Sequence, residues 1–94
     1  MLHIVNTSPF SDLSLEKCID RMQPQDGLIL IEDATYALNQ LEVWQSRLTP
    51  ECKLYVLQDD AIARGLCVEQ LELNWVSYDE FVGLTLSYPK TLSW

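Results

Sequence analysis

Glycine and histidine are both scarce in this chain. Three glycines, at positions 27, 65 and 83, and one histidine, His3, occur in 94 residues. The chain has no GxGxxG sequence and no P-loop, which argues against a nucleotide-binding loop. A single histidine argues against a dedicated Cys/His zinc site. His3 lies inside a short apolar stretch, so we interpret it as a core or edge histidine with satisfied hydrogen bonds. The sequence therefore predicts no cofactor and no metal.

Positive charge is scarce as well. Six Lys and Arg residues face 14 Asp and Glu residues, and the formal net charge is -8. A nucleic-acid backbone or an anionic membrane surface would repel such a chain at long range. We therefore expect no direct nucleic-acid binding and no membrane binding, and a role near RNA would require a partner protein.

Long hydrophobic runs are absent. No apolar run approaches the roughly 20 residues of a transmembrane helix, and the first residues lack the basic region and apolar core of a signal peptide. The three cysteines form no CxxC pair, and their odd number is typical of reduced thiols rather than a disulfide framework. We expect a cytoplasmic protein with one domain over residues 1–94.

The most informative stretch is the aliphatic run at 28–31, which follows Gly27 and precedes Glu32 and Asp33. Such a run predicts a strand buried on both faces, with its carboxyl end leading into a helix. The rest of the chain repeats this plan: the expected strands are 2–5, 28–31, 52–57 and 73–76, and the expected helices are 12–22, 34–47, 61–64 and 78–87. Alternation with short connections predicts parallel pairing and right-handed crossovers. The expected fold is α/β, a three-layer α/β/α sandwich with a mostly parallel sheet of four or five strands.

Acidic residues gather where the expected strands lead into helices, at Glu32, Asp33, Asp59 and Asp60. Helix capping explains Asp33, and one of Asp59 and Asp60, without a further function. The four carboxylates could also form an acidic rim for a ligand. Ser77 and Glu80 have the spacing of a capping box, and Gly65 is placed to end the third helix.

The three cysteines lie in different settings. Cys18 falls on the apolar stripe of the first helix, where a thiol usually serves as packing. Cys52 opens a strand and is interpreted as a small buried hydrophobe. Cys67 follows Arg64 in a loop, where the guanidinium could lower the pKa of the thiol. The residues alone assign no function to any of the three.

Several segments together resemble the TusB/DsrH family along the whole chain. They are the opening Met1-Leu2-His3 with Ser8-Pro9, then Leu30-Ile31-Glu32-Asp33, then 56–66 with its D-x-x-A-R-G sequence, and 78–94 with its Y-x-x-F-V-x-L-T sequence, Pro89 and terminal Trp94. Each motif is weak alone, but the combination is distinctive, and the chain length also agrees.

The resemblance implies a DsrEFH-like fold and a subunit of a sulfur-relay complex. The implied partners are TusC-like and TusD-like subunits in a dimer of heterotrimers, and the implied process is 2-thiolation of the wobble uridine of certain tRNAs. The principal persulfide cysteine of such a complex belongs to the TusD-like subunit, so this chain would be an accessory subunit rather than a catalyst. Some DsrH-like members carry a first-helix cysteine, which makes Cys18 a candidate sulfur carrier in an analogous sulfur-oxidation complex.

Three functional hypotheses follow. The chain is a non-catalytic subunit that completes a relay complex, or it carries sulfur itself on Cys18, or it is an unrelated α/β binding domain with an acidic ligand rim. For the first two, the apolar end of the chain predicts a partner surface. If Phe81, Val82 and Thr85 serve the core, the side chains left to contact a partner are Leu84, Tyr88, Leu92 and Trp94. The alternative for Trp94 is that it folds back over a neighbouring helix.

Overall fold

A computed structural model describes residues 1–66, 69 and 71–94. The five strands are β1 (Leu2–Val5), β2 (Gly27–Leu30), β3 (Lys53–Leu57), β4 (Asn74–Val76) and β5 (Thr91–Ser93). The helices are α1 (Ser14–Arg21), the 3-10 helix η1 (Glu32–Gln40), α2 (Leu41–Arg47), α3 (Gln58–Ala63) and α4 (Tyr78–Ser87). This order confirms the expected α/β fold.

The five strands form one parallel sheet in the order β4-β3-β2-β1-β5. β2 is the central strand, and all four of its residues are buried, as its unbroken aliphatic sequence predicts. Gly27 of β2 pairs with Leu2 of β1 on one side and with Lys53 of β3 on the other.

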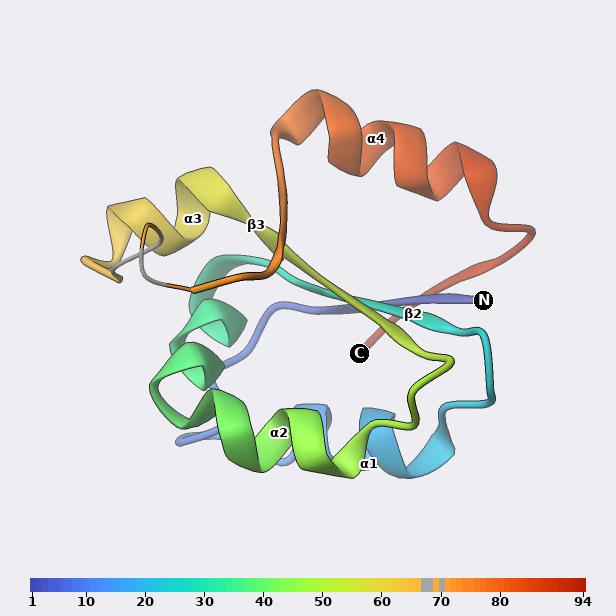
Figure 1. The fold of residues 1–94 in the computed structure, drawn as a ribbon, viewed down its shortest axis with the longest axis horizontal. Helices are drawn as coiled ribbons and strands as arrows, with labels where there is room; N and C mark the ends of the chain where they lie inside the picture. Colours follow the sequence, from blue (N-terminus) through green and yellow to red (C-terminus); the bar gives the residue numbers. More distant parts are fainter. Residues whose placement is uncertain (67–68, 70) are drawn as a thin grey trace.

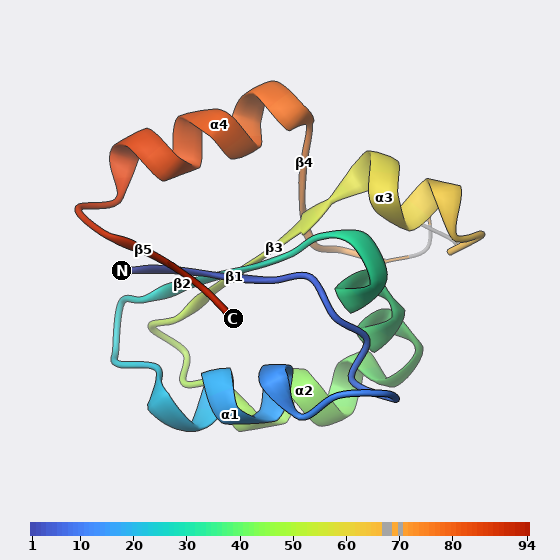
Figure 2. The ribbon, with the colours of Figure 1, turned by 180° about the vertical axis from the view of Figure 1, so that it is seen from behind.

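The strand order decides which helices cover which face. The steps from β1 to β2, β3 and β4 each move one strand in the same direction, so right-handed connections place their helices on one face. The step from β4 to β5 crosses back over the whole sheet and places α4 on the other face. Figure 1 shows α4 above the sheet, α1 and α2 below it and α3 beyond the end of β3, and Figure 2 shows the same arrangement from behind.

Each face of the sheet has its own hydrophobic cluster. The cluster on the α1 and α2 side is the larger one and includes Val5, Leu28 and Val56 from the strands with Leu15 of α1 and Ala61 of α3. Among the described residues, the cluster under α4 has four buried members, which are Leu2, Ile29, Leu57 and Val76. No residue of α4 itself is fully buried. The two faces of the sheet are therefore covered unequally.

Two details of the second and third helices differ from the expectation. The long helix expected at 34–47 is divided into the 3-10 helix η1 and the short helix α2. η1 begins at Glu32 and α3 begins at Gln58, so Asp33, Asp59 and Asp60 lie inside the first turns and cap neither helix. By contrast, the capping box of α4 is confirmed: Glu80 N–H donates to Ser77 Oγ at 3.1 Å, and Ser77 N–H donates to Glu80 Oε1 at 2.9 Å.

The C-terminal tail forms the edge strand β5, which the four expected strands did not include. Leu2 N–H donates to the carbonyl of Lys90, and Trp94 N–H donates to the carbonyl of Ile4. The indole Nε1–H of Trp94 also donates to His3 Nδ1 at 3.1 Å. The Arg21 guanidinium lies 5.7 Å from the centre of the Trp94 ring, so the indole does fold back toward α1, which was the alternative reading of this residue.

The buried carboxylate of Asp26 joins both ends of the chain. Its Oδ2 lies 2.9 Å from His3 Nε2 and accepts a hydrogen bond from Gln23 N–H at 3.0 Å, and its Oδ1 lies 3.2 Å from the N-terminal amine. Because His3 Nδ1 accepts from Trp94, the histidine is neutral with its proton on Nε2, which donates to Asp26. This confirms His3 as a core histidine with satisfied hydrogen bonds.

We predict that Asp26→Asn destabilises the protein by about 1–3 kcal/mol at pH 7, because it weakens the acceptor of one buried and two partly buried hydrogen bonds. Burial raises the pKa of Asp26, but the hydrogen bonds from Gln23, His3 and the N-terminal amine outweigh burial and lower it. The contribution of the carboxylate is therefore present above the unfolded pKa of about 4 and is lost as the pH falls through the lower folded value. Urea unfolding at several pH values measures both effects.

Asp20→Asn is the matched control. Asp20 forms an exposed ion pair with Arg47, so its substitution should lower the free energy of unfolding by at most about 1 kcal/mol. Equal losses for the two variants would contradict a special role of the buried carboxylate.

Candidate functional site

Cys18, the candidate sulfur carrier, lies on the face of α1 that packs against the sheet. It is fully buried between Leu15 and Ile19 in the larger hydrophobic cluster. Burial, and then the negative charge of Asp26, raise the pKa of the Cys18 thiol to about 12. At neutral pH only about one thiol in 10⁵ would then be ionised, and the thiolate is the reactive form. In this conformation Cys18 is a packing residue.

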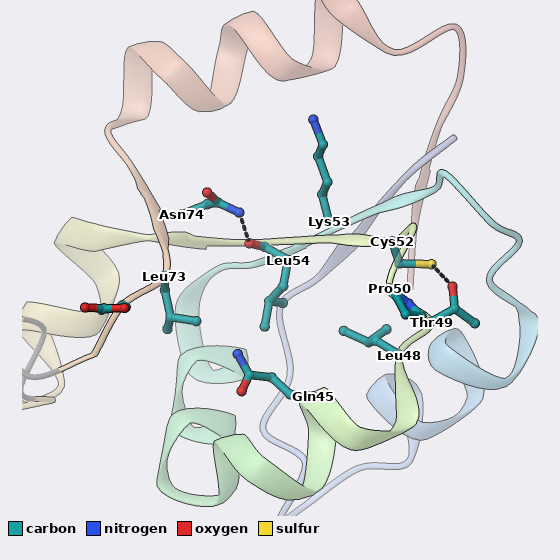
Figure 3. A pocket seen from close by; sticks show the side chains of 10 residues that line it. Gln45, Leu48, Thr49, Pro50, Cys52, Lys53, Leu54, Leu73 and Asn74 are labelled. Carbon is teal, nitrogen blue, oxygen red and sulfur yellow. Dashed lines mark hydrogen bonds between the residues drawn. The ribbon is translucent and has the colours of Figure 1, made fainter.

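Cys52 lies at the wall of a surface cavity rather than in the core. Its Sγ donates to the carbonyl of Gln23 at 3.4 Å and lies 3.3 Å from Thr49 Oγ1. Figure 3 shows Cys52 and Thr49 side by side at one end of this cavity, while Lys53 turns to the opposite side of the sheet. The cavity measures ≈ 770 Å³ and is lined by residues of α2, β3 and β4 and of the segments that flank them. The interpretation of Cys52 as a buried hydrophobe is thus wrong, because the thiol is only half-buried.

At least two of the four carboxylates expected to form an acidic rim accept hydrogen bonds from neighbouring residues. Asp33 Oδ1 accepts a hydrogen bond from Arg64 Nε at 2.8 Å, and Asp60 Oδ2 accepts one from the backbone N–H of Glu32 at 2.6 Å. Glu32 itself has a left-handed backbone, with φ at 49°. The rim therefore contains links between η1 and α3.

Arg64 takes part in the same set of contacts. Its side chain also donates to the carbonyl of Asp60 at 3.1 Å, and the hydrogen bond to Asp33 raises the pKa of the guanidinium. The expected effect of Arg64 on Cys67 cannot be compared with these contacts, since Cys67 lies outside the described residues.

The side chains expected to contact a partner lie partly against the subunit's own sheet. Leu84 and Tyr88 pack on the small cluster under α4, and Trp94 packs on the larger cluster. The assumption that these three point away from the core is wrong. Of the four residues, only Leu92 exposes a large part of its side chain. A contact between these residues and a partner stays a prediction.

The position of Tyr88 shows why the sequence predicted the wrong core-facing side of α4. Its hydroxyl lies 3.3 Å from that of Tyr55, and a Cβ on Gly27 would come within 2.5 Å of the same hydroxyl oxygen. The glycine thus makes room for Tyr88 over the sheet, and burial raises the pKa of the phenol. Val82, expected in the core, lies on the exposed side of the helix instead.

Residues 1–66, 69 and 71–94 contain no group of three or more His, Cys, Asp or Glu side chains placed to hold a metal ion. Within the same residues, no helix is long and apolar enough to cross a bilayer.

Comparison with known proteins gives consistent results. A model of the DsrH-like protein family matches residues 7–91. Proteins named TusB from Yersinia pestis (strain Pestoides F) and Yersinia pseudotuberculosis (serotype O:1b) are each 36% identical to this chain over 97 aligned positions, which cover both proteins completely. The solution structure of protein Tm0979 from Thermotoga maritima has a TM-score of 0.66 and 27% identity, and the alignment covers 96% of this chain and 97% of the other.

We predict that Cys18 reacts slowly with a thiol reagent while the protein is folded. In a variant that keeps only Cys18, the rate of reaction with Ellman's reagent should rise at least ~100-fold when guanidinium unfolds the chain, because the thiol must be exposed and ionised to react. A variant that keeps only Cys52 is the control and should react faster in the folded state. Equal folded-state rates for the two variants would show that α1 opens readily.

Proposed function

The chain belongs to the TusB/DsrH family, and from this we propose that it is a non-catalytic subunit of a cytoplasmic sulfur-relay complex. Its partners in this proposal are TusC-like and TusD-like subunits, which assemble with it as a dimer of heterotrimers. The complex passes persulfide sulfur toward 2-thiolation of the wobble uridine of tRNA. The alternative is a DsrH-like subunit of a sulfur-oxidation complex that carries sulfur on Cys18.

The chemistry of a relay step separates the two roles. A thiolate on the acceptor attacks the outer sulfur of a donor persulfide, the S–S bond of the donor breaks, and the donor leaves as a thiolate. The acceptor thereby becomes the persulfide, and no metal or external oxidant takes part. Such a step requires a thiol that is both reachable and ionised near neutral pH.

The observation that carries the proposal is the environment of Cys18. This thiol is fully buried, and its pKa is raised to about 12, so it meets neither requirement in the folded subunit. Carrying sulfur on Cys18 would require α1 to move away from the sheet. The non-catalytic role requires no such movement, and it leaves the transferring cysteine on a partner subunit.

The charge of the chain supports transfer through partners. With a net charge of -8, the subunit would be repelled by the tRNA backbone. A subunit that shapes the complex, rather than one that delivers sulfur to RNA, is compatible with this charge.

We predict that co-expression with the TusC-like and TusD-like chains of the same genome yields one stable particle that contains two copies of each subunit. Size-exclusion chromatography with light scattering and quantitative gel analysis would measure the stoichiometry. Separate elution of this chain from both relatives would contradict the proposal.

We also predict that Cys18 is dispensable for tRNA thiolation. Deleting the gene should abolish wobble 2-thiouridine, measured by mass spectrometry of digested tRNA, and a copy with Cys18→Ala should restore it, since Ala keeps most of the packing of a buried thiol. Loss of thiolation by Cys18→Ala with unchanged complex assembly would favour the sulfur-carrier alternative.

A further inference from the structure

The outer face of α4 has a composition unusual for a helix that faces solvent. No charged residue occurs from Phe81 to Pro89, although 21% of the whole chain is charged. Val82 is 42% exposed and Leu86, one turn further along, is 82% exposed. A surface helix normally presents charged or polar side chains on the side opposite its core-facing stripe. α4 instead has apolar side chains on both sides.

The inner side of α4 already packs against the subunit's own sheet. Phe81, Leu84 and Tyr88 are spaced three and four residues apart, and all three pack on the small cluster formed by β1, β2, β3 and β4. Val82 and Leu86 lie on the other side of the helix and are not part of this contact. Their exposure follows from the topology, which in the described part of the chain places no second helix over the small cluster that α4 covers.

Gly83 provides an independent observation on the same outer face. Glycine is among the least favourable residues inside a helix, and here it lies in the middle of α4. A Cβ at this position would meet no atom within 4 Å, so nothing in the described part of the subunit requires a glycine there. A small residue between Val82 and Leu86 does allow the backbone of another element to approach closely.

We propose that Val82, Gly83 and Leu86, together with the exposed Tyr78 at the start of the helix, form a docking surface for the corresponding helix of a second α/β subunit. These four residues are the α4 outer face. The proposal rests on the proposed function, because it assigns a surface to the partner contact of the relay complex. This surface also differs from the one that the sequence suggested, which was formed by Leu84, Tyr88, Leu92 and Trp94.

The strand order and the net charge together indicate that a related α/β subunit binds this surface. Any subunit with the strand order β4-β3-β2-β1-β5 has one helix alone on one face, so two such subunits have matching uncovered helices. The fold recurs in the Thermotoga protein, which aligns over nearly its whole length. Two copies of this chain, each with a net charge of -8, would repel one another, which favours a related subunit of lower negative charge over a second copy.

Substitutions on α4 and a matched control test the proposal in the reconstituted complex. The readout is the Kd of this subunit for the TusC-like and TusD-like pair. Val82→Lys and Leu86→Lys should each weaken binding at least about tenfold, because each buries a charge at the contact. Val43→Lys is the control, since Val43 is 53% exposed on α2, which covers the opposite face, and it should change Kd by less than about twofold.

The Gly83→Leu variant distinguishes the loss of a contact with the partner from unfolding of the subunit itself. Leucine is a good helix former, and a Cβ at position 83 meets no atom of the subunit within 4 Å. This variant should therefore unfold at a temperature equal to or above that of the wild type, while binding falls at least about tenfold. Weaker binding together with a lower unfolding temperature would overturn the assignment of Gly83 to a contact.

The remaining outcomes are distinguishable. If the wild-type subunit binds the pair and the α4 variants bind equally well, or if Val43→Lys weakens binding as much as they do, the α4 surface is wrong and the proposed function stands. If the wild-type subunit binds neither relative, both proposals fail. A homodimer of this chain that Val82→Lys dissociates would show that a second copy, not a related subunit, occupies the surface.

Discussion

The right-handedness of parallel crossovers is the constraint on which the rest of this structure depends. Three successive strand-to-strand steps in one direction place α1, η1, α2 and α3 on one side. In the residues that the structure describes, the single return step gives the other side only α4. The two hydrophobic clusters differ in size for this reason. The exposure of Val82 and Leu86 is a consequence of the same connectivity, since no second helix in the described part of the chain lies beside α4.

The carboxylate of Asp26 connects the stability of the subunit to its chemistry. It accepts hydrogen bonds from His3 and Gln23 and pairs with the N-terminal amine, and through His3 it orients the ring that holds Trp94 at the end of β5. The same negative charge adds to burial in raising the pKa of Cys18. The group that holds the two ends of the chain together therefore also makes the thiol of α1 less reactive, which agrees with the non-catalytic role that we propose.

The sequence predicted those elements whose signals are local and strong. The run after Gly27 identified the central strand, and the Ser77 and Glu80 spacing identified the start of α4, because a buried strand and a capping box each have their own pattern. β5 was missed since its three residues are exposed and show no alternation, and its position depends on pairing with β1, a strand almost ninety positions earlier. The caps expected at Asp33 and at one of Asp59 and Asp60 were wrong. Contacts between η1 and α3, such as the hydrogen bond from Arg64 to Asp33, involve residues distant in sequence that a local pattern does not reveal.

The error made at α4 follows from the helix being apolar around most of its circumference. Phe81, Val82 and Thr85 form one plausible inner stripe, and Phe81, Leu84 and Tyr88 form another, so periodicity cannot decide which stripe meets the sheet. Only the structure shows that the second stripe is used, with Gly27 making room for Tyr88. A helix that is apolar around most of its circumference is typical of a buried position, yet the described part of this subunit buries only one side of α4. The sequence of α4 is thus consistent with a helix that is buried in an assembly, and the outer stripe is the part of it that the fold of the subunit alone leaves unexplained.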